Sequence, residues 1–336
     1  MNKIALTGIK PTGIPHIGNY FGAIKPAIDL ISKEDFDGYY FIADYHALNF
    51  MKNKEDLNKY TKEIACTWLA CGLDPNRIVF YKQSLVPEVT ELNWLLNNVT
   101  SKGLMNRAHA YKALVEKSVA NGGDPDALVN MGLYCYPILM AADILLFNTK
   151  IVPVGLDQKQ HVEMARDIAK AFNKLYGYTF VVPTEYIQEE TATIPGLDGR
   201  KMSKSYGNQI PLFCDEATLK KLISSIKTDS SLPTEPKSTN CALFDFYKLF
   251  ATKEQTEAFA EKFANGISWA DAKKELFEIA NAYLSPMREK YNYYMNHYDE
   301  VEKILEEGSK KARVIAKETI ARARKAVGFD QFYNDY

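Results

Sequence analysis

After the strand-like run Ile4-Ala5-Leu6, the chain reads Thr7-Gly8-Ile9-Lys10-Pro11-Thr12-Gly13-Ile14-Pro15-His16-Ile17-Gly18-Asn19-Tyr20-Phe21-Gly22. Its glycines and prolines predict a tight turn whose backbone can approach a ligand closely. Apolar periodicity then predicts a helix from about Ile17 to Ile31. A strand, a glycine-rich turn and a helix N-terminus together attract phosphate, because unpaired N–H groups and the helix dipole point at it. The known dinucleotide and P-loop glycine patterns are absent, so the turn alone does not name the nucleotide.

The next elements predict a parallel sheet. A β-branched and aromatic run over Gly38–Asp44 predicts a buried strand, Asn53–Leu73 an amphipathic helix, and Ile78–Tyr81 a third strand. Alternating strands and helices of this length indicate a right-handed parallel α/β sheet. His46 follows the second strand, which places it at the edge where ligands collect, although a core or capping histidine has the same pattern.

Residues from about 86 to 147 are expected to form a helical insertion, interrupted by the polar loop 118–126. Its last helix is apolar except for Asp143, which must be partnered or face a cavity because an unpaired buried carboxylate is costly. Sheet character returns at Ile151–Gly155, and a helix is predicted from about residue 157 to 175. We therefore expect a second strand-to-helix turn at the ligand edge of the sheet.

Strand signals fade beyond Ile210, and the remaining chain predicts helices. These cover Glu216–Ser224, Leu243–Ala251, Glu254–Ala264, Ser268–Leu284 and about Asp299–Val327. The predicted fold class is α/β: a Rossmann-like parallel sheet with a helical insertion, followed by an all-helical C-terminal domain. We place the catalytic domain at 1–207 and the helical domain at 208–336, with the last helix able to pack back on the catalytic domain.

Composition limits the classes of function. The 336 residues are 46% hydrophobic and 25% charged, with a net charge of −1, as expected for a globular chain. No run approaches 18 apolar residues and no leader precedes the first strand, so we expect a cytoplasmic protein without a membrane span. Five cysteines without a C-x-x-C pair favour buried apolar residues over disulfides or zinc. The charge balance requires any RNA partner to be met by a local basic patch, and no DNA partner is expected.

A second polar motif lies in Leu197–Asn208, where Lys201-Met202-Ser203-Lys204-Ser205 is flanked by glycines. Alone, this run would indicate a solvated, mobile cluster of charges. Together with His16-Ile17-Gly18-Asn19 far upstream, it resembles the paired signatures of class I aminoacyl-tRNA synthetases. The block Val152-Pro153-Val154-Gly155 and the helix around Asp143 extend the resemblance over nearly the whole chain, to the bacterial-type tryptophanyl members of that family.

The resemblance implies a ligase that uses ATP to activate L-tryptophan as tryptophanyl-adenylate and then transfers it to tRNA(Trp). It also implies a homodimer, an anticodon-binding role for residues 208–336, and Mg²⁺ bound through the phosphates of ATP without a protein metal site. Because a carboxylate is already a competent nucleophile, positioning and charge stabilisation would do the catalytic work. The implied catalytic residues are Lys201, Lys204, His16 and Lys10.

The implied binding residues fall into two sets. The ATP set is Ile9, Lys10, Pro11, Thr12, Gly18, Asn19, Gly155, Asp157, Gln158, Lys201, Met202, Ser203, Lys204 and Ser205. The tryptophan set is Leu6, Gly8, His46, Tyr136, Met140, Asp143, Val152, Val154 and Gln158. Asp143 would accept the single N–H of the indole, which gives a polar basis for selectivity. Met140, Val152 and Val154 are equally compatible with plain core positions.

Several alternatives stay open at this level. Lys10 stands where many members of the family have Gln, and Leu156 stands where many have an acid, and these are the two departures from the family pattern. Tyrosyl-tRNA synthetases share the fold, an inactive RNA-binding paralogue would retain it, and a small-metabolite nucleotidyltransferase could share the first motif. The basic run over Lys310–Lys325 indicates either an RNA-binding face or a solvated helix face.

Overall fold

In the computed structural model, residues 3–33, 36–154, 158–187 and 194–329 are described. Five parallel strands form one sheet in the order β3-β2-β1-β4-β5, with β1 at Lys3–Ile9, β2 at Phe36–Ile42, β3 at Ile78–Lys82, β4 at Ile151–Val154 and β5 at Thr184–Ile187. The predicted parallel α/β fold is confirmed. Strand order reverses between β1 and β4, and ligands of open parallel sheets bind at the carboxyl ends of the strands at such a point.

Successive residues of each strand pack into different cores, because side chains alternate across a sheet. Ala5, Tyr40 and Phe80 belong to one buried cluster, whereas Leu6 and Phe41 belong to the other. The first cluster includes α2 (Lys25–Lys33) and α4 (Lys54–Ala70). The second includes α5 (Glu88–Asn97), α8 (Met131–Leu146) and α9 (Lys159–Tyr176). Helices therefore cover both faces of the sheet, and its carboxyl edge is left for ligands.

The remaining elements of the first 207 residues are short helices and helical turns, most of which lie where the sequence predicts the first helix and the helical insertion. The helical run after the first turn comprises α1 (Ile17–Asn19), a π-helix (Tyr20–Ile24) and α2. The other elements of this half are α3 (Asp44–Ala47), α6 (Lys102–Met105), α7 (His109–Ala120) and two 3-10 turns at Gln83–Leu85 and Lys204–Tyr206. β5 was not predicted, because four residues at a sheet edge give little periodic signal.

The C-terminal third is helical, as predicted. It contains α10 (Glu216–Ser224), α11 (Ala242–Phe250), α12 (Lys253–Asn265), α13 (Trp269–Asn296) and α14 (Tyr298–Val327). The predicted end of α13 at Leu284 is wrong, since the helix continues through Pro286. Contacts on both sides of the proline support the longer helix. The Tyr283 hydroxyl, before the proline, bonds the Tyr20 hydroxyl, and the Tyr291 hydroxyl, after it, donates to Glu63.

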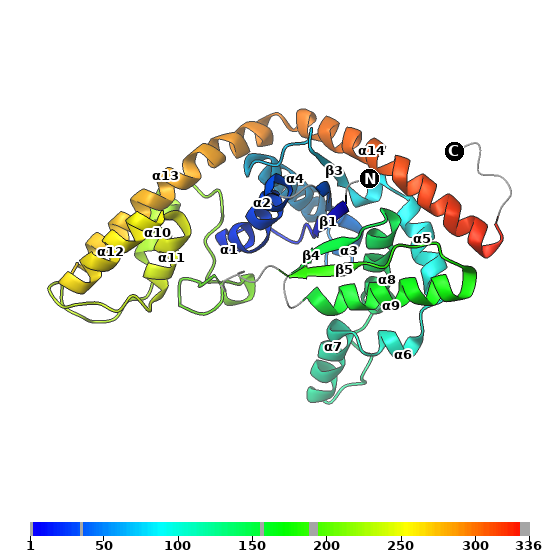
Figure 1. Ribbon diagram of the computed structural model, residues 1–336. Coiled ribbons are helices and arrows are strands. Elements are labelled where there is room, and N and C mark those ends of the chain that lie inside the picture. The colour runs from blue at the N-terminus through cyan, green and yellow to red at the C-terminus, as the bar shows by residue number, and fades with distance from the viewer. Residues whose placement is uncertain (1–2, 34–35, 155–157, 188–193, 330–336) are drawn as a thin grey trace.

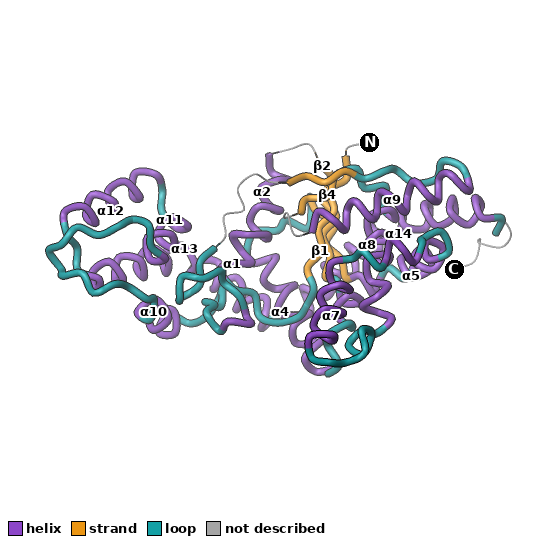
Figure 2. The backbone as a smooth tube through the Cα atoms, turned by 90° about the horizontal axis from the view of Figure 1, so that it is seen from below, coloured by secondary structure: helices purple, strands orange, loops and turns teal. Residues whose placement is uncertain are grey.

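The helices α10–α12 and the first half of α13 form a unit at one end of the molecule, and the sheet lies in the middle (Figures 1 and 2). The long helix α14 then runs back over the sheet, where it packs on β3 and α5. A methyl group added at Gly308 of α14 would lie 1.8 Å from the carbonyl oxygen of Phe80, so the helix and the strand are in backbone contact. Within the described residues, no helix is long and apolar enough to cross a membrane.

Candidate active site

A cavity of about 590 Å³ lies at the carboxyl end of β1, between the first turn and the Lys201–Lys204 loop. Both sequence motifs line it, together with Gln158 at the start of α9. The structure thus brings together two segments that lie almost 200 residues apart in the chain. The predicted residues among its lining are Gly8, Ile9, Lys10, Thr12, His16, Gly18, Asn19, Gln158, Lys201, Met202, Ser203 and Lys204.

His16 starts the helical run through a reciprocal cap with Asn19. Its Nδ1 accepts the Asn19 backbone N–H at 3.3 Å, and the Asn19 side-chain oxygen accepts the His16 N–H at 3.1 Å. Burial, and then the charge of Lys204, lower the pKa of His16 to about 4. The ring is therefore neutral at pH 7, and with Nδ1 accepting, its Nε2 carries the hydrogen. His16 can offer a ligand a neutral hydrogen-bond donor rather than a charge.

Lys204 reaches across the cavity to the first turn. Its ammonium donates to the Thr12 carbonyl at 2.9 Å and lies 5.4 Å from the Tyr60 ring. A methyl group added at Gly13, whose φ is +152°, would lie 1.2 Å from the same nitrogen. Only glycine at position 13 leaves room for this ammonium. Burial lowers the pKa of Lys204.

The rest of the lysine loop is held by side chains and backbone. The Gly18 N–H lies 3.3 Å from the sulfur of buried Met202. Asn208 accepts the Ser203 N–H at 2.9 Å and donates to Asp198 at 2.7 Å and to the Lys201 carbonyl at 3.2 Å. The sequence gives no indication of this role for Asn208. Its burial among charged neighbours depends on the fold of the loop, which the order of residues does not reveal.

The residues after the loop pair with the residues around His16. The Ile17 N–H donates to the Ile210 carbonyl at 3.0 Å, and the Leu212 N–H donates to the Pro15 carbonyl at 3.0 Å. These two backbone bonds connect the segment that follows the loop to the turn, whereas the side chain of Asn208 bonds within the loop itself.

Asp143 of α8 is the centre of a buried polar cluster with residues that follow β2 and β3 in the chain. It is 2% exposed, and its Oδ2 lies 2.9 Å from His46 Nε2. The Gln83 amide donates to both carboxylate oxygens, at 2.8 and 2.9 Å. Burial raises the pKa of Asp143, whereas the hydrogen bonds from His46 and Gln83 lower it. The expectation that Asp143 is partnered is confirmed.

Gln83 was missed by the sequence analysis, although it directly follows β3 as His46 follows β2. It is 1% exposed, and its side-chain oxygen accepts the Tyr45 N–H at 3.1 Å. His46 was predicted because it follows a strand at the carboxyl edge of the sheet, and Gln83 occupies the corresponding position after β3. His161 was not predicted as a site residue either, and its Nε2 lies 2.6 Å from the Tyr136 hydroxyl oxygen. Burial raises the pKa of Tyr136 to about 12, so this phenol stays protonated.

The other predicted positions separate into three groups. Leu6 and Val152 are buried core residues, and Met140 packs against that core. Pro11 is buried and Ser205 is exposed on the loop. Gly155, Leu156 and Asp157 lie outside the described residues, as does the side chain of Val154. Lys10 is exposed, with its ammonium 5.7 Å from the Phe50 ring.

The cavity offers cations, hydroxyls and N–H groups, and its described lining contains no Asp or Glu. Within the described part of the chain, no three His, Cys, Asp or Glu side chains are grouped so that they could hold a metal ion. Such a lining suits a polyanion such as a nucleoside triphosphate. Asp143, His46 and Gln83 are not among the lining residues of this cavity, and their separate cluster offers a buried acceptor.

Comparison with known proteins gives consistent matches. Residues 2–285 match the family model for class I tRNA synthetases (W and Y). The tryptophan–tRNA ligase of Xanthomonas campestris is 52% identical over 331 residues, which cover 98% of this chain and 77% of that protein. The crystal structure of tryptophanyl-tRNA synthetase from Campylobacter jejuni complexed with ADP and tryptophan has a TM-score of 0.88 and 44% identity, covering 96% and 99% of the two chains.

The tyrosyl-tRNA synthetase of Archaeoglobus fulgidus, complexed with L-tyrosine, is more distant. It has a TM-score of 0.63 and 20% identity, covering 86% of this chain and 90% of that one. This second likeness supports the fold alone.

Proposed function

The chain belongs to the class I tRNA synthetases of the W and Y group, and we propose that it is a tryptophan–tRNA ligase that forms tryptophanyl-adenylate from ATP and L-tryptophan. The observation that carries this proposal is the meeting of the two motifs around one cavity, with Lys204 on the Thr12 carbonyl. High identity to a tryptophan–tRNA ligase over nearly the full chain supports the choice of amino acid.

The first step joins the tryptophan carboxylate to the α-phosphorus of ATP and releases pyrophosphate. No base is required, because the carboxylate is already ionised at neutral pH. The enzyme must hold the two reactants in line and stabilise the charge that develops on the leaving pyrophosphate. Lys201 and Lys204, at the cavity wall, supply that charge, and neutral His16 supplies a donor.

The second step transfers the tryptophanyl group to the 3′-terminal ribose of tRNA(Trp). A ribose hydroxyl oxygen attacks the adenylate carbonyl, its proton leaves, and AMP departs with the bonding electrons. We assign the RNA contacts outside the active site to residues 208–336, as an anticodon-binding domain. The cations that line the cavity between α10 and α13 support this assignment.

Selectivity for the indole is assigned to Asp143. Its carboxylate oxygens offer about four acceptor directions, and His46 and Gln83 fill at most three of them. A direction left for the indole N–H would allow discrimination on the order of 10⁴ against a ring that lacks the donor. His46, Tyr136 and Gln158 are assigned to the polar end of the amino acid.

Mg²⁺ is proposed to arrive with ATP. The cavity lining has no carboxylate among its described residues, and Mg²⁺ readily binds through phosphate oxygens while keeping its waters. In that role the ion offsets phosphate charge. Lys10, Lys201 and Lys204 are the residues of this chain that complement the remaining charge.

We also propose that the enzyme acts as a homodimer in the cytoplasm, where protein synthesis occurs. Large apolar side chains at the surface support the dimer: Trp94, Phe50 and Met131 are 67%, 59% and 71% exposed. A methyl group added at Gly132 would lie 2.7 Å from the side-chain oxygen of Asn49, so the segments that carry Met131 and Phe50 lie close together. Sedimentation should show a dimer in the wild type and a monomer in Met131→Asp; a wild-type monomer would contradict this.

The decisive experiment is pyrophosphate exchange into ATP with tryptophan and with tyrosine. Tryptophan should support exchange at least a hundredfold better, in terms of kcat/KM. A preference for tyrosine would overturn the substrate assignment, and no exchange with either amino acid would overturn the enzyme assignment. The variant Asp143→Ala should lose tryptophan selectivity with a smaller change in the KM for ATP.

A further inference from the structure

A small cavity of about 160 Å³ lies where the first turn, α4, the segment after the lysine loop and α13 meet. Ile14 and Pro15 line both this cavity and the active-site cavity, so the turn forms a shared wall. The Pro15 carbonyl accepts the Leu212 N–H at 3.0 Å, which places the small cavity beside the point where the turn is joined to that segment. None of the described residues assigned to ATP or to tryptophan lines it.

Glu63 of α4 brings a negative charge to the wall of this cavity. It is 7% exposed, and the Tyr291 hydroxyl of α13 donates to its carboxylate. Burial, and then the hydrogen bond to Glu63, raise the pKa of Tyr291, so the phenol stays neutral. Among the residues that the structure describes, Glu63 has no ion-pair partner. A buried carboxylate whose partner is neutral favours the binding of a cation beside it.

Two cations close to these elements are engaged elsewhere. The ammonium of Lys62 lies 4.8 Å from an aromatic ring at the start of α14. The Arg288 guanidinium donates to Asn281 at 3.0 Å, and its charge acts on the thiol of Cys214 in the cavity wall. Because Arg288 repels a second cation at the Cys214 end, a bound cation is favoured at the Glu63 end.

Thr67 adds a second polar group on the same face of α4, one helical turn after Glu63. It is 1% exposed, and its hydroxyl has no hydrogen-bond partner among the described residues. A buried hydroxyl of this kind calls for a partner that the cavity itself can hold. The Phe213 and Tyr291 rings, whose centroids lie 4.8 Å apart, complete the wall with aromatic surface.

We propose that this cavity binds a small organic ammonium ion, with the charged group on Glu63 and Thr67 and the apolar part against Phe213 and Tyr291. An ammonium group has three donors and needs acceptors, which the carboxylate and the hydroxyl oxygen supply. Aromatic faces attract organic cations. The volume suits a ligand about as large as benzene, which fills a cavity of about 150 Å³. This site does not depend on which amino acid the chain activates.

The first test follows the alkylation of Cys214, a half-buried residue of the cavity wall. n-Butylammonium chloride is the probe, and at millimolar concentration it should slow the reaction of Cys214 with iodoacetamide saturably. Burial raises the pKa of this thiol and of Cys241, so the labelling is done at mildly alkaline pH. Cys241 is also half-buried but lies outside the cavity lining, and mass spectrometry of the peptides should show it unprotected.

Two further solutes separate the possible occupants. 1-Butanol has nearly the same shape without the charge and should protect Cys214 at least tenfold more weakly. Potassium chloride at the same ionic strength should not protect it. Equal protection by 1-butanol would assign the cavity to any small apolar molecule, and equal protection by potassium would assign it to an inorganic cation. Either result, or no protection of Cys214 by n-butylammonium, would overturn the proposal.

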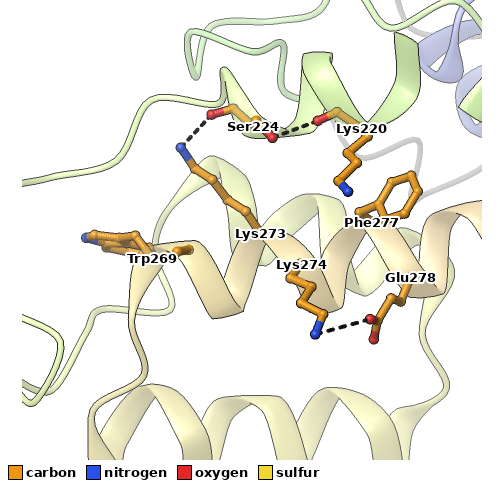
Figure 3. A pocket seen from close by; sticks show the side chains of 8 residues that line it. Lys220, Ser224, Trp269, Lys273, Lys274, Phe277 and Glu278 are labelled. Carbon is orange, nitrogen blue, oxygen red and sulfur yellow. Dashed lines mark hydrogen bonds and ion pairs between the residues drawn. The ribbon is translucent and has the colours of Figure 1, made fainter. Parts of the chain in front are cut away.

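The second test removes the charge of Glu63. Glu63→Gln keeps an oxygen that can accept the Tyr291 hydroxyl, and it should weaken n-butylammonium binding at least tenfold without changing that of 1-butanol. Glu278→Gln is the matched control on α13, because Glu278 is exposed in the separate cavity of the helical unit (Figure 3). This control should leave the binding of both solutes unchanged. Equal binding of n-butylammonium by the wild type and Glu63→Gln would contradict the assigned role of the carboxylate.

Thr67→Val keeps the proposal testable if Glu63→Gln does not fold. It removes a hydroxyl that has no partner within the described structure and keeps the shape of the side chain, so the fold should be retained. The loss of one hydrogen bond should weaken n-butylammonium binding about two- to tenfold. Unchanged binding in Thr67→Val would overturn the placement of the ammonium group.

Discussion

Gln83 determines which further hydrogen bonds the carboxylate of Asp143 can accept. Its amide group donates to both oxygens while its own oxygen accepts the Tyr45 N–H, so the side chain is held at both ends. Burial favours the neutral form of Asp143, and a protonated carboxyl would be a poorer acceptor for an indole N–H. The two hydrogen bonds from Gln83 counter that tendency. If Asp143 has its proposed role, recognition of the indole depends on a residue that need not touch it.

We expect Gln83→Leu to raise the pKa of Asp143, because the substitution removes hydrogen bonds to the charged form. Tryptophan kcat/KM should fall about 10- to 100-fold near pH 7, the range for hydrogen bonds to a charged group. The loss should shrink as pH rises, since the carboxylate returns. The measurement is the pH profile of kcat/KM for tryptophan in pyrophosphate exchange, with the KM for ATP recorded beside it.

His46, Asp44 and Tyr81 also interact with Asp143 and are unchanged in this variant, so they contribute equally to both profiles. Gln160→Leu serves as the control, because Gln160 bonds His109 and Arg107 instead. A loss in Gln83→Leu that does not depend on pH would indicate a packing defect rather than control of the carboxylate.

The turn after β1 and the Lys201–Lys204 loop work as a pair of elements. The sequence predicts both and predicts that they meet, because two signatures of one family stand in the right order. It cannot predict that Lys204 passes directly over Gly13, since that contact depends on how α4 and the segment around Ile210 place the loop. Glycine at position 13 is favoured by its own φ of +152°, and it also leaves the space that the Lys204 ammonium, 191 positions away, occupies.

Gly13→Ala should therefore displace Lys204 and slow adenylate formation about as much as Lys204→Ala does. The added methyl group would lie 1.2 Å from the Lys204 nitrogen, far inside contact distance. In the Lys204→Ala background the same substitution should cost much less, roughly threefold or below, because residues in contact are not additive. The measurement is the single-turnover rate of adenylate formation in the four proteins of this cycle.

Gly72→Ala is the matched control, because Gly72 also has a positive φ, of +101°, and a methyl group there meets nothing within 4 Å. Full additivity of Gly13→Ala and Lys204→Ala would contradict the contact, and would assign the effect to the backbone of the turn alone.

The elements that sequence predicts well are those with long apolar periodicity. The parallel strands β1 to β4, the helical insertion and α10 to α12 follow from pattern. β5 and the second half of α13 do not, because edge pairing and tertiary contacts decide them. The same division holds in the site: the motif residues carry local signals, whereas Gln83 and Asn208 are defined by partners that only the fold brings near.

The molecule is connected from end to end by α13 and α14. The basic run over Lys310–Lys325 was open to two interpretations, an RNA-binding face or a solvated face. The structure shows that two of its arginines instead contact α5: Arg313 pairs with Glu88, and Arg324 pairs with Glu91. Arg322 bonds Asn148 at 2.6 Å. Three of the seven cations in this run therefore help to dock the last helix on the half of the molecule that contains the sheet.

We expect Arg313→Ala to lower the free energy of unfolding by about 2–3 kcal/mol, because it leaves the buried Glu88 carboxylate unpaired. The guanidinium contacts Glu88 at 2.8 and 3.2 Å through Nε and is itself partly exposed, which keeps the loss below that of a fully buried pair. Lys310→Ala is the control on the same helix: its pair with Glu307 is exposed and screened by water, so its loss should lie within the error of the measurement. Urea titration at neutral pH measures both losses. Glu88→Gln added to Arg313→Ala should recover part of the loss.

Equal losses in the two single variants would mean that the apolar face of α14 holds the helix and that the ion pair adds nothing. That face consists of buried residues that neither substitution changes, among them Val301, Leu305, Ala312 and Ile320.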